Sequence, residues 1–223
     1  MKSFYQYSFT FCILVLMYGC ASYAPTNNKL SGVLSKSEQV ILNLSEKILQ
    51  TKDDDLIVKY NALEEKYKEL FPVLENCNKK YGLTTNYVLT LQEAQKALER
   101  LDKGFAITQD RVFILDAIYQ DYDAKLQSIL SSAQNDANTK IRVTVNSSVD
   151  DGFFVFGKLS YENKLDIKRF RFNKPTQNAS QDFVPGYYLF WLEKEDRIGE
   201  AELHLILSNG KEEVKQLVLK TPK

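Results

Sequence analysis

Residues 56–81 read LIVKYNALEEKYKELFPVLENCNKKY, and this stretch decides the helical part of the fold. Apolar side chains recur in it at alternating steps of four and three residues: Leu56, Tyr60, Leu63, Tyr67, Leu70, Leu74, Cys77 and Tyr81. This spacing is the a/d pattern of a helix that lays one apolar stripe against a partner helix. The stretch therefore predicts a helix of about 27 residues, roughly 40 Å long, with a kink at Pro72.

A second run keeps the same spacing from residue 87 to residue 133. Its apolar positions are Tyr87, Leu91, Ala94, Leu98, Leu101, Phe105, Val112, Leu115, Tyr119, Tyr122, Leu126, Ile129 and Ala133. Gly82 separates the two runs and predicts a helix end, so the two stripes can fold back and bury each other. The second run has two interpretations. Gly104, with a restart between Thr108 and Asp110, favours two helices, which we expect, whereas the unbroken spacing favours one long rod.

The segment before the first stripe contains another predicted helix. Ser35 and Glu38 have the capping-box spacing, so we expect this helix to begin near Ser35. The acidic run 53–55 interrupts the apolar pattern and offers an N-cap to the helix that follows. Residues 20–32 are rich in Ser, Thr, Asn and Pro without periodicity, which predicts a flexible tether that reaches roughly 20 Å.

The chain begins with an apolar run from Phe9 to Tyr18 that is too short to span a bilayer comfortably. The run is followed by Gly19-Cys20, and the segment resembles the signal sequence of bacterial lipoproteins. The resemblance implies that residues 1–19 form a signal peptide, that Cys20 carries lipid, and that three acyl chains hold the protein stably on a membrane. Ala21 after the cysteine implies the outer membrane, with the protein facing the periplasm and the cell surface as the alternative. An ordinary secretory peptide cut nearby, or an uncleaved anchor, are the competing interpretations.

Composition narrows the classes of function. The formal charge is −3 over residues 21–138 and +2 over 139–223, so neither half indicates nucleic acid or an anionic membrane surface as a partner. With lipid on Cys20, the mature chain keeps Cys77, whose place in the apolar stripe indicates a small core residue. The histidine of the chain, His204, is expected on the exposed side of a strand. No nucleophile motif, phosphate loop or metal-ligand motif occurs, so the sequence predicts no enzyme, no cofactor and no metal site.

Beyond residue 138 the apolar pattern changes to period two, which predicts strands. We expect six or seven strands, among them 141–145, 153–161, 165–172, 187–194, 201–207 and 214–219. Residues 174–181 are expected to form a loop, and a shift of register within 165–172 predicts a bulge near Lys168-Arg169.

The turns between these strands indicate how they connect. Asp151-Gly152 and Asn209-Gly210 are β-hairpin signals, and Pro185-Gly186 suits a type II turn. Strands joined by turns, with no helix between them, predict an antiparallel β-sandwich that is broadly immunoglobulin- or transthyretin-like. The predicted class is therefore α+β, with an antiparallel, coiled-coil-like helical hairpin or bundle at 33–137 and the β-sandwich at 138–223.

Aromatic side chains crowd into this β region. In the strand at 187–192 both alternating sets are apolar, with Tyr188 and Phe190 in one set and Trp191 in the other. A sheet with one wet face would alternate with polar residues, so the second face needs a cover. The cover is either the helices of the same chain or another protein or ligand, and Tyr and Trp suit such a recognition surface.

Two functions are compatible with these features. The first is a non-enzymatic structural or adaptor lipoprotein that binds another envelope protein through Tyr188, Phe190, Trp191, Arg169 and Arg171. The alternative is a lipoprotein that binds a small molecule or a glycan with the aromatic face. The two arginines either meet an acidic partner or protect an edge strand from pairing. The helical stripe also allows a homo-oligomer.

Overall fold

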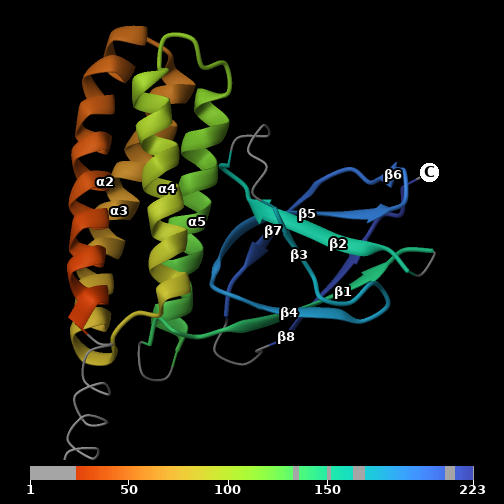
Figure 1. The fold of residues 1–223 in the computed structure, drawn as a ribbon. Helices are drawn as coiled ribbons and strands as arrows, with labels where there is room; N and C mark the ends of the chain where they lie inside the picture. Colours follow the sequence, from red (N-terminus) through yellow and green to blue (C-terminus); the bar gives the residue numbers. More distant parts are fainter. Residues whose placement is uncertain (1–23, 133–135, 150–151, 163–168, 209–213, 223) are drawn as a thin grey trace, which may run out of the picture.

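The computed structural model describes residues 24–132, 136–149, 152–162, 169–208 and 214–222. In these residues four α-helices precede eight β-strands in two sheets, which confirms the α+β class (Figure 1). The helices, together called the helical part, are α2 (Ala24–Thr51), α3 (Asp54–Tyr81), α4 (Thr85–Lys103) and α5 (Arg111–Ser131). The strands, together called the β part, are β1 (Ile141–Ser147), β2 (Phe154–Leu159), β3 (Phe170–Arg171), β4 (Ala179–Phe183), β5 (Gly186–Lys194), β6 (Arg197–Ile198), β7 (Glu202–Ile206) and β8 (Val214–Leu219).

The apolar stripes are buried as the sequence predicts. From Leu56 to Cys77 every stripe residue of α3 is at most 4 % exposed, and the helix runs through Pro72 without a break. The N-cap of α3 is Asp53, whose carboxylate accepts a hydrogen bond from Leu56 N at 3.1 Å. The second run is two helices, because α4 ends at Gly104 and α5 begins only at residue 111.

The helices pack in the cyclic order α2, α3, α5, α4 (Figure 1). α3 packs against α2 and α5, and α4 packs against α2, while α4 and α5 make far fewer contacts with each other. The stripe of α3 therefore meets the second half of the second run and not its first half. An apolar stripe specifies which face of a helix is buried, but it does not specify which helix covers that face.

The start of the first helix corrects the predicted tether. α2 begins at Ala24, so Ser35 lies inside the helix and the capping box is not used. Leu30, Val33 and Leu34 are buried, and their spacing continues the apolar stripe of α2 towards the N-terminus. Polar composition alone misled the prediction, because a surface helix needs apolar residues on one face only. The expected tether at 20–32 is therefore helical from Ala24, and residues 20–23 lie outside the described part.

The strands form two sheets. Sheet A has the order β4-β1-β8, and sheet B has the order β3-β2-β5-β6, with β7 also paired to β5. β1 pairs with β4 in antiparallel and with β8 in parallel orientation, so the arrangement is not purely antiparallel. The strand β4 was expected to be part of a loop. Its three central residues are polar, and two of them are exposed, so the hydrophobic pattern does not indicate the pairing of β4 with β1.

The two predicted hairpins are wrong. β1 and β2 belong to different sheets, as do β7 and β8, so neither pair of consecutive strands forms a hairpin. A turn signal reports local backbone preference, whereas the pairing of distant strands wins when it buries more apolar surface. Gly152 does adopt a positive φ of 79°, as a turn requires, while residues 150–151 and 209–213 lie outside the described part. The predicted bulge near residue 168 also falls partly outside it.

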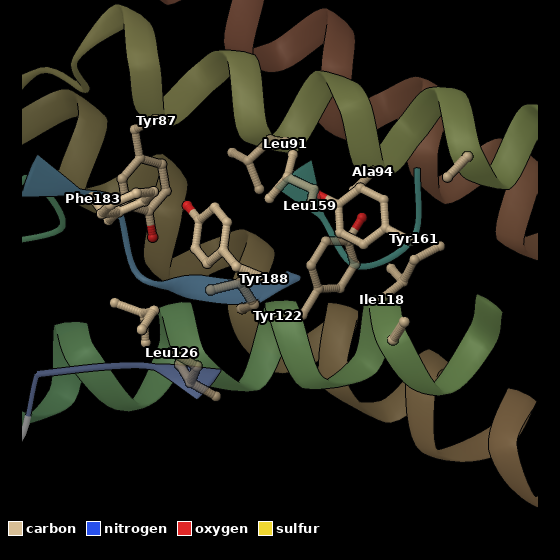
Figure 2. Close-up of a cluster of buried hydrophobic side chains, with 14 of the residues drawn as sticks. Tyr87, Leu91, Ala94, Ile118, Tyr122, Leu126, Leu159, Tyr161, Phe183 and Tyr188 are labelled. Carbon is tan, nitrogen blue, oxygen red and sulfur yellow. The ribbon is translucent and has the colours of Figure 1, made fainter. Parts of the chain in front are cut away.

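Side chains of the β part enter between α4 and α5 (Figure 2). Leu159 and Tyr161 come from the end of β2 and beyond it, while Phe183 and Tyr188 come from β4 and β5. All four are buried. Because they occupy the space between the two helices, α4 and α5 contact each other little, and the helical and β parts share one hydrophobic core.

Candidate binding cleft

The exposed side of sheet B carries a small network around Trp191. The Trp191 ring stacks on Phe156, directly opposite on β2, with ring centroids 6.2 Å apart. The Arg169 guanidinium lies over the Phe156 ring, 4.3 Å from its centroid. Trp191 Nε1 donates a hydrogen bond to Glu193 at 2.7 Å, and the same carboxylate forms an ion pair with Arg169. The network fixes the orientation of the indole while leaving Trp191 half-buried.

This network forms part of a cleft between the helical part and sheet B. The cleft has a volume of about 950 Å³ and lies where α4 ends and α5 begins. Its apolar residues come from both parts of the chain. They include Ala97, Leu101, Phe113 and Ile114 from the helices, and Leu189, Trp191, Ile198 and Leu203 from strands β5, β6 and β7. Phe113 is 45 % exposed and Leu203 41 % exposed, so this apolar surface is open to solvent. Its size falls in the range typical of ligand pockets.

Charges of both signs surround the apolar surface of the cleft. Lys158, Asp110 and Glu200 line it and form no ion pair with any residue that the structure describes. Ser160 also lines the cleft, is 2 % exposed, and has no hydrogen-bond partner among the described residues. The cleft can therefore hold an amphipathic group, with apolar contact at the centre and polar contacts at the rim.

The structure separates the predicted binding residues. Tyr188 is 4 % exposed and Phe190 is fully buried, so neither can contact a partner, and this part of the prediction is wrong. The pleat of β5 turns these two side chains towards the core and turns Trp191 to the outer face. Arg169 lines the cleft, whereas Arg171 is exposed outside it, over the Phe154 ring at 4.7 Å. Cys20 lies outside the described residues.

The cover of the second face of β5 comes partly from the helices. Tyr187, on that face, packs against the hydrophobic core next to α5. Leu189 and Trp191, further along the strand, remain half-buried and line the cleft. The helices therefore cover one end of this face and leave the other end open.

A buried ion pair joins the helical part to the β part, and sequence reasoning missed it. Lys125 Nζ lies 2.7 Å from both carboxylate oxygens of Asp121, and both side chains are fully buried. Lys125 also donates a hydrogen bond to Pro185 O at 3.0 Å, and Asp121 accepts one from Tyr187 N at 3.3 Å. We call Asp121 and Lys125 the junction ion pair, because each of them forms a hydrogen bond with the backbone at the start of β5. Burial raises the pKa of Asp121 and lowers the pKa of Lys125. The signal in the sequence was their i,i+4 spacing next to the stripe residues of α5.

His204 and Cys77 both lie away from the cleft. His204 is half-buried and not exposed as expected, because residues 202 and 204 of β7 lie on the same side of the sheet as the buried residues of β5. Its Nε2 lies 3.7 Å from Glu202, and burial lowers the pKa of His204. Cys77 is buried on α3, and burial raises the pKa of its thiol. Neither residue lines the cleft.

Within the described ranges no cluster of three or more His, Cys, Asp or Glu side chains could hold a metal ion. None of the described helices is both long and apolar enough to cross a bilayer. Comparison with protein-family models, with curated proteins and with solved structures found no match to this chain. The fold and the cleft therefore carry the functional argument.

Proposed function

We propose that this protein is a non-enzymatic lipoprotein of the outer membrane, anchored through Cys20 and facing the periplasm. It works as a structural or adaptor subunit, and part of another envelope protein docks in the cleft. The observation that carries the proposal is the open apolar surface around Trp191, which has the aromatic centre and polar rim common in recognition sites.

The position of the cleft supports an adaptor role. The cleft lies at the end of α4, whereas the first described residue, Ala24, lies at the opposite end of the helical part (Figure 1). α4 has 19 residues, which corresponds to about 28 Å. With a lipid at the N-terminus, the helices would act as a spacer that presents the cleft away from the membrane.

The finer description of the fold is part of the same proposal. We interpret the helical part as an antiparallel bundle and the two sheets as a β-sandwich. Contacts between aromatic rings of the two sheets support this: the centroid of Phe183 in sheet A lies 5.4 Å from that of Phe190 in sheet B. An immunoglobulin- or transthyretin-like topology of the two sheets is part of this proposal.

The test of the docking cleft compares two substitutions of exposed apolar residues. Leu203→Glu places a charge in the cleft, and Val218→Glu places one on β8, where the residue is 62 % exposed and lies outside the cleft. Proteins crosslinked to the wild-type chain in intact cells should be lost from Leu203→Glu and retained by Val218→Glu. The docking role is refuted if both variants retain the same crosslinked proteins or both lose them while remaining folded by circular dichroism.

The anchor has its own test. Cys20→Ala should move the protein from the membrane fraction to the soluble fraction, because the acyl chains supply the stable attachment. A variant that stays with the membrane after high-salt and carbonate washing would show that the anchor does not depend on Cys20.

The second candidate function is binding of a small molecule or a glycan in the same cleft. The observation that favours it is the fixed network of Trp191, Arg169 and Glu193, which combines an aromatic ring with hydrogen-bonding groups of both signs. Trp191 is the one tryptophan of the chain, so its fluorescence reports on the cleft directly. A saturable fluorescence change with cell-wall glycan fragments, absent in a Leu203→Glu control, would favour this function over the adaptor.

A further inference from the structure

One end of the helical part brings together three chain segments. They are the beginning of α2, the turn between α3 and α4, and the segment that follows α5 (Figure 1). Asn138, after α5, ties two of them together, because its Nδ2 donates to Gly82 O at 2.6 Å and its Oδ1 accepts from Thr84 N at 2.8 Å. We call this the proximal end, and it comprises residues 24–30, 78–86, 131–132 and 136–139.

The proximal end is basic. Lys29, Lys79 and Lys80 are exposed there, and none forms an ion pair with a residue that the structure describes. Lys80 Nζ lies 4.8 Å from the ring centroid of Tyr81, so an aromatic ring accompanies the charge. Asp136 is the one acidic residue in these segments, which gives a formal charge of +2.

The opposite end of the helical part is acidic. The turn between α2 and α3 carries the run 53–55 beside Lys52, and the connection between α4 and α5 adds charges of both signs. Residues 49–56 and 102–111, which form this distal end, have a formal charge of −2. The formal charge over residues 21–138 is −3, so the proximal end, where α2 begins, is a positively charged end on an otherwise acidic helical part.

The distance to the proposed lipid anchor is short. Four residue steps separate Cys20 from Ala24, the first residue of α2, and a fully extended chain covers at most about 14 Å in that distance. If Cys20 is lipidated, Ala24 therefore stays within about 14 Å of the anchored residue, while the tilt of the helices relative to the membrane is still free. Exposed Lys side chains attract anionic headgroups within about a Debye length, and Tyr suits the interface.

We infer that the proximal end is a membrane-docking surface, in which Lys29, Lys79 and Lys80 contact anionic phospholipid headgroups. This contact sets the orientation of the molecule: the acidic distal end and the cleft point away from the bilayer. The inference rests on the proposed lipid anchor, and it goes beyond that anchor because lipidation alone does not fix which side of the protein faces the membrane.

The experiment measures lysine accessibility in the full lipidated chain. The protein is placed in phosphatidylcholine vesicles, with or without phosphatidylglycerol, and labelled with a water-soluble acetylating reagent. Mass spectrometry then gives the labelling of Lys29, Lys79 and Lys80 relative to Lys52 and Lys103, which are exposed at the distal end and serve as internal controls. We expect this ratio to fall at least threefold when phosphatidylglycerol is added.

A variant separates charge from simple proximity to the bilayer. In Lys79→Gln/Lys80→Gln, labelling of Lys29 on anionic vesicles should rise towards its level on neutral vesicles. An unchanged ratio on the two kinds of vesicle, or protection of Lys52 and Lys103, would overturn the inference. Vesicle flotation of the same samples measures whether the lipid anchor attaches the chain to the vesicles. A chain that floats with an unchanged ratio refutes the docking surface alone, and a chain that does not float on either vesicle refutes both proposals.

Discussion

Replacing Lys125 with methionine should lower the free energy of unfolding by about 3–5 kcal/mol, the cost of breaking a buried ion pair by removing one partner. The variant leaves the Asp121 carboxylate fully buried without the ammonium that lies 2.7 Å from both of its oxygens. It also removes the donor to Pro185 O. The N–H of Tyr187, 3.3 Å from the carboxylate, remains but does not balance a full charge.

The pH dependence of this variant follows from the same charge. Burial already raises the pKa of Asp121, and removal of Lys125 raises it further because the favourable charge is lost. A carboxyl whose folded-state pKa is raised favours the folded state below its unfolded-state pKa, and that contribution is lost as the pH rises through the folded-state pKa. The destabilisation by Lys125→Met should therefore be smaller at about pH 5 than at about pH 7.

The double variant Asp121→Asn/Lys125→Met tests whether the two charges act as a pair. The amide oxygen of asparagine can still accept from Tyr187 N, so the main remaining defect is the unpaired Pro185 carbonyl, which costs about 1–3 kcal/mol. We expect the double variant to be more stable than Lys125→Met alone, which gives a coupling energy of about 2 kcal/mol or more.

The matched control is Lys68→Met on the surface of α3. Lys68 pairs with Glu64 at the same i,i+4 spacing and in the same order, but its side chain is 57 % exposed. Its loss should cost less than about 0.5 kcal/mol. Equilibrium unfolding in urea, followed by circular dichroism and by Trp191 fluorescence, measures the wild type, both single variants Asp121→Asn and Lys125→Met, their double variant and Lys68→Met. A cost below 1 kcal/mol for Lys125→Met, or additive effects in the double variant, would refute the reasoning.

Three further predictions test packing, protonation and hydrogen bonding. Gly186→Ala should destabilise the protein by about 1–3 kcal/mol, because the new Cβ would lie 2.5 Å from the Asp121 carboxylate of the junction ion pair. Gly32→Ala, whose Cβ would have no atom within 4 Å, should stabilise the protein by about 0.5–1 kcal/mol. Thermal unfolding compares the two variants, and a more stable Gly186→Ala would contradict the packing. Burial lowers the pKa of His204, so its contribution to stability is lost as the pH falls through the folded-state pKa. In His204→Gln the free energy of unfolding should therefore fall less steeply below about pH 6.5 than in the wild type. Equal pH slopes of the two proteins, from urea unfolding between about pH 7.5 and 5.5, would count against this prediction. Tyr87→Phe should raise the free energy of unfolding by about 1 kcal/mol, because the buried Tyr87 hydroxyl has no hydrogen-bond partner among the described residues. Tyr60→Phe loses a 3.1 Å hydrogen bond to Ile41 O and should lower the free energy of unfolding by a similar amount. Urea unfolding measures both variants, and a less stable Tyr87→Phe or a more stable Tyr60→Phe would refute these hydrogen-bond assignments.

The candidate site was only partly accessible from the sequence. The alternating apolar sets of strand 187–192 indicated a cover for the second face of β5, and the helices cover one end of it, while Trp191 and Arg169 line the open cleft at the other end. Tyr188 and Phe190 were included because the sequence does not say which alternating set faces the core. The pleat gives two opposite faces, and only packing against sheet A decides which of them is buried.

The sequence by itself determined the helical stripes, the α+β class and the break near Gly104. These features follow from spacings of a few residues, because a helix buries one face wherever its apolar side chains recur every three or four positions. The tertiary structure alone decided that β1 pairs in parallel with β8, that side chains of the β part separate α4 from α5, and that Asp121 and Lys125 are buried together. Each of these depends on contacts between segments distant in the chain, and a local pattern carries no information about which distant surface will cover it.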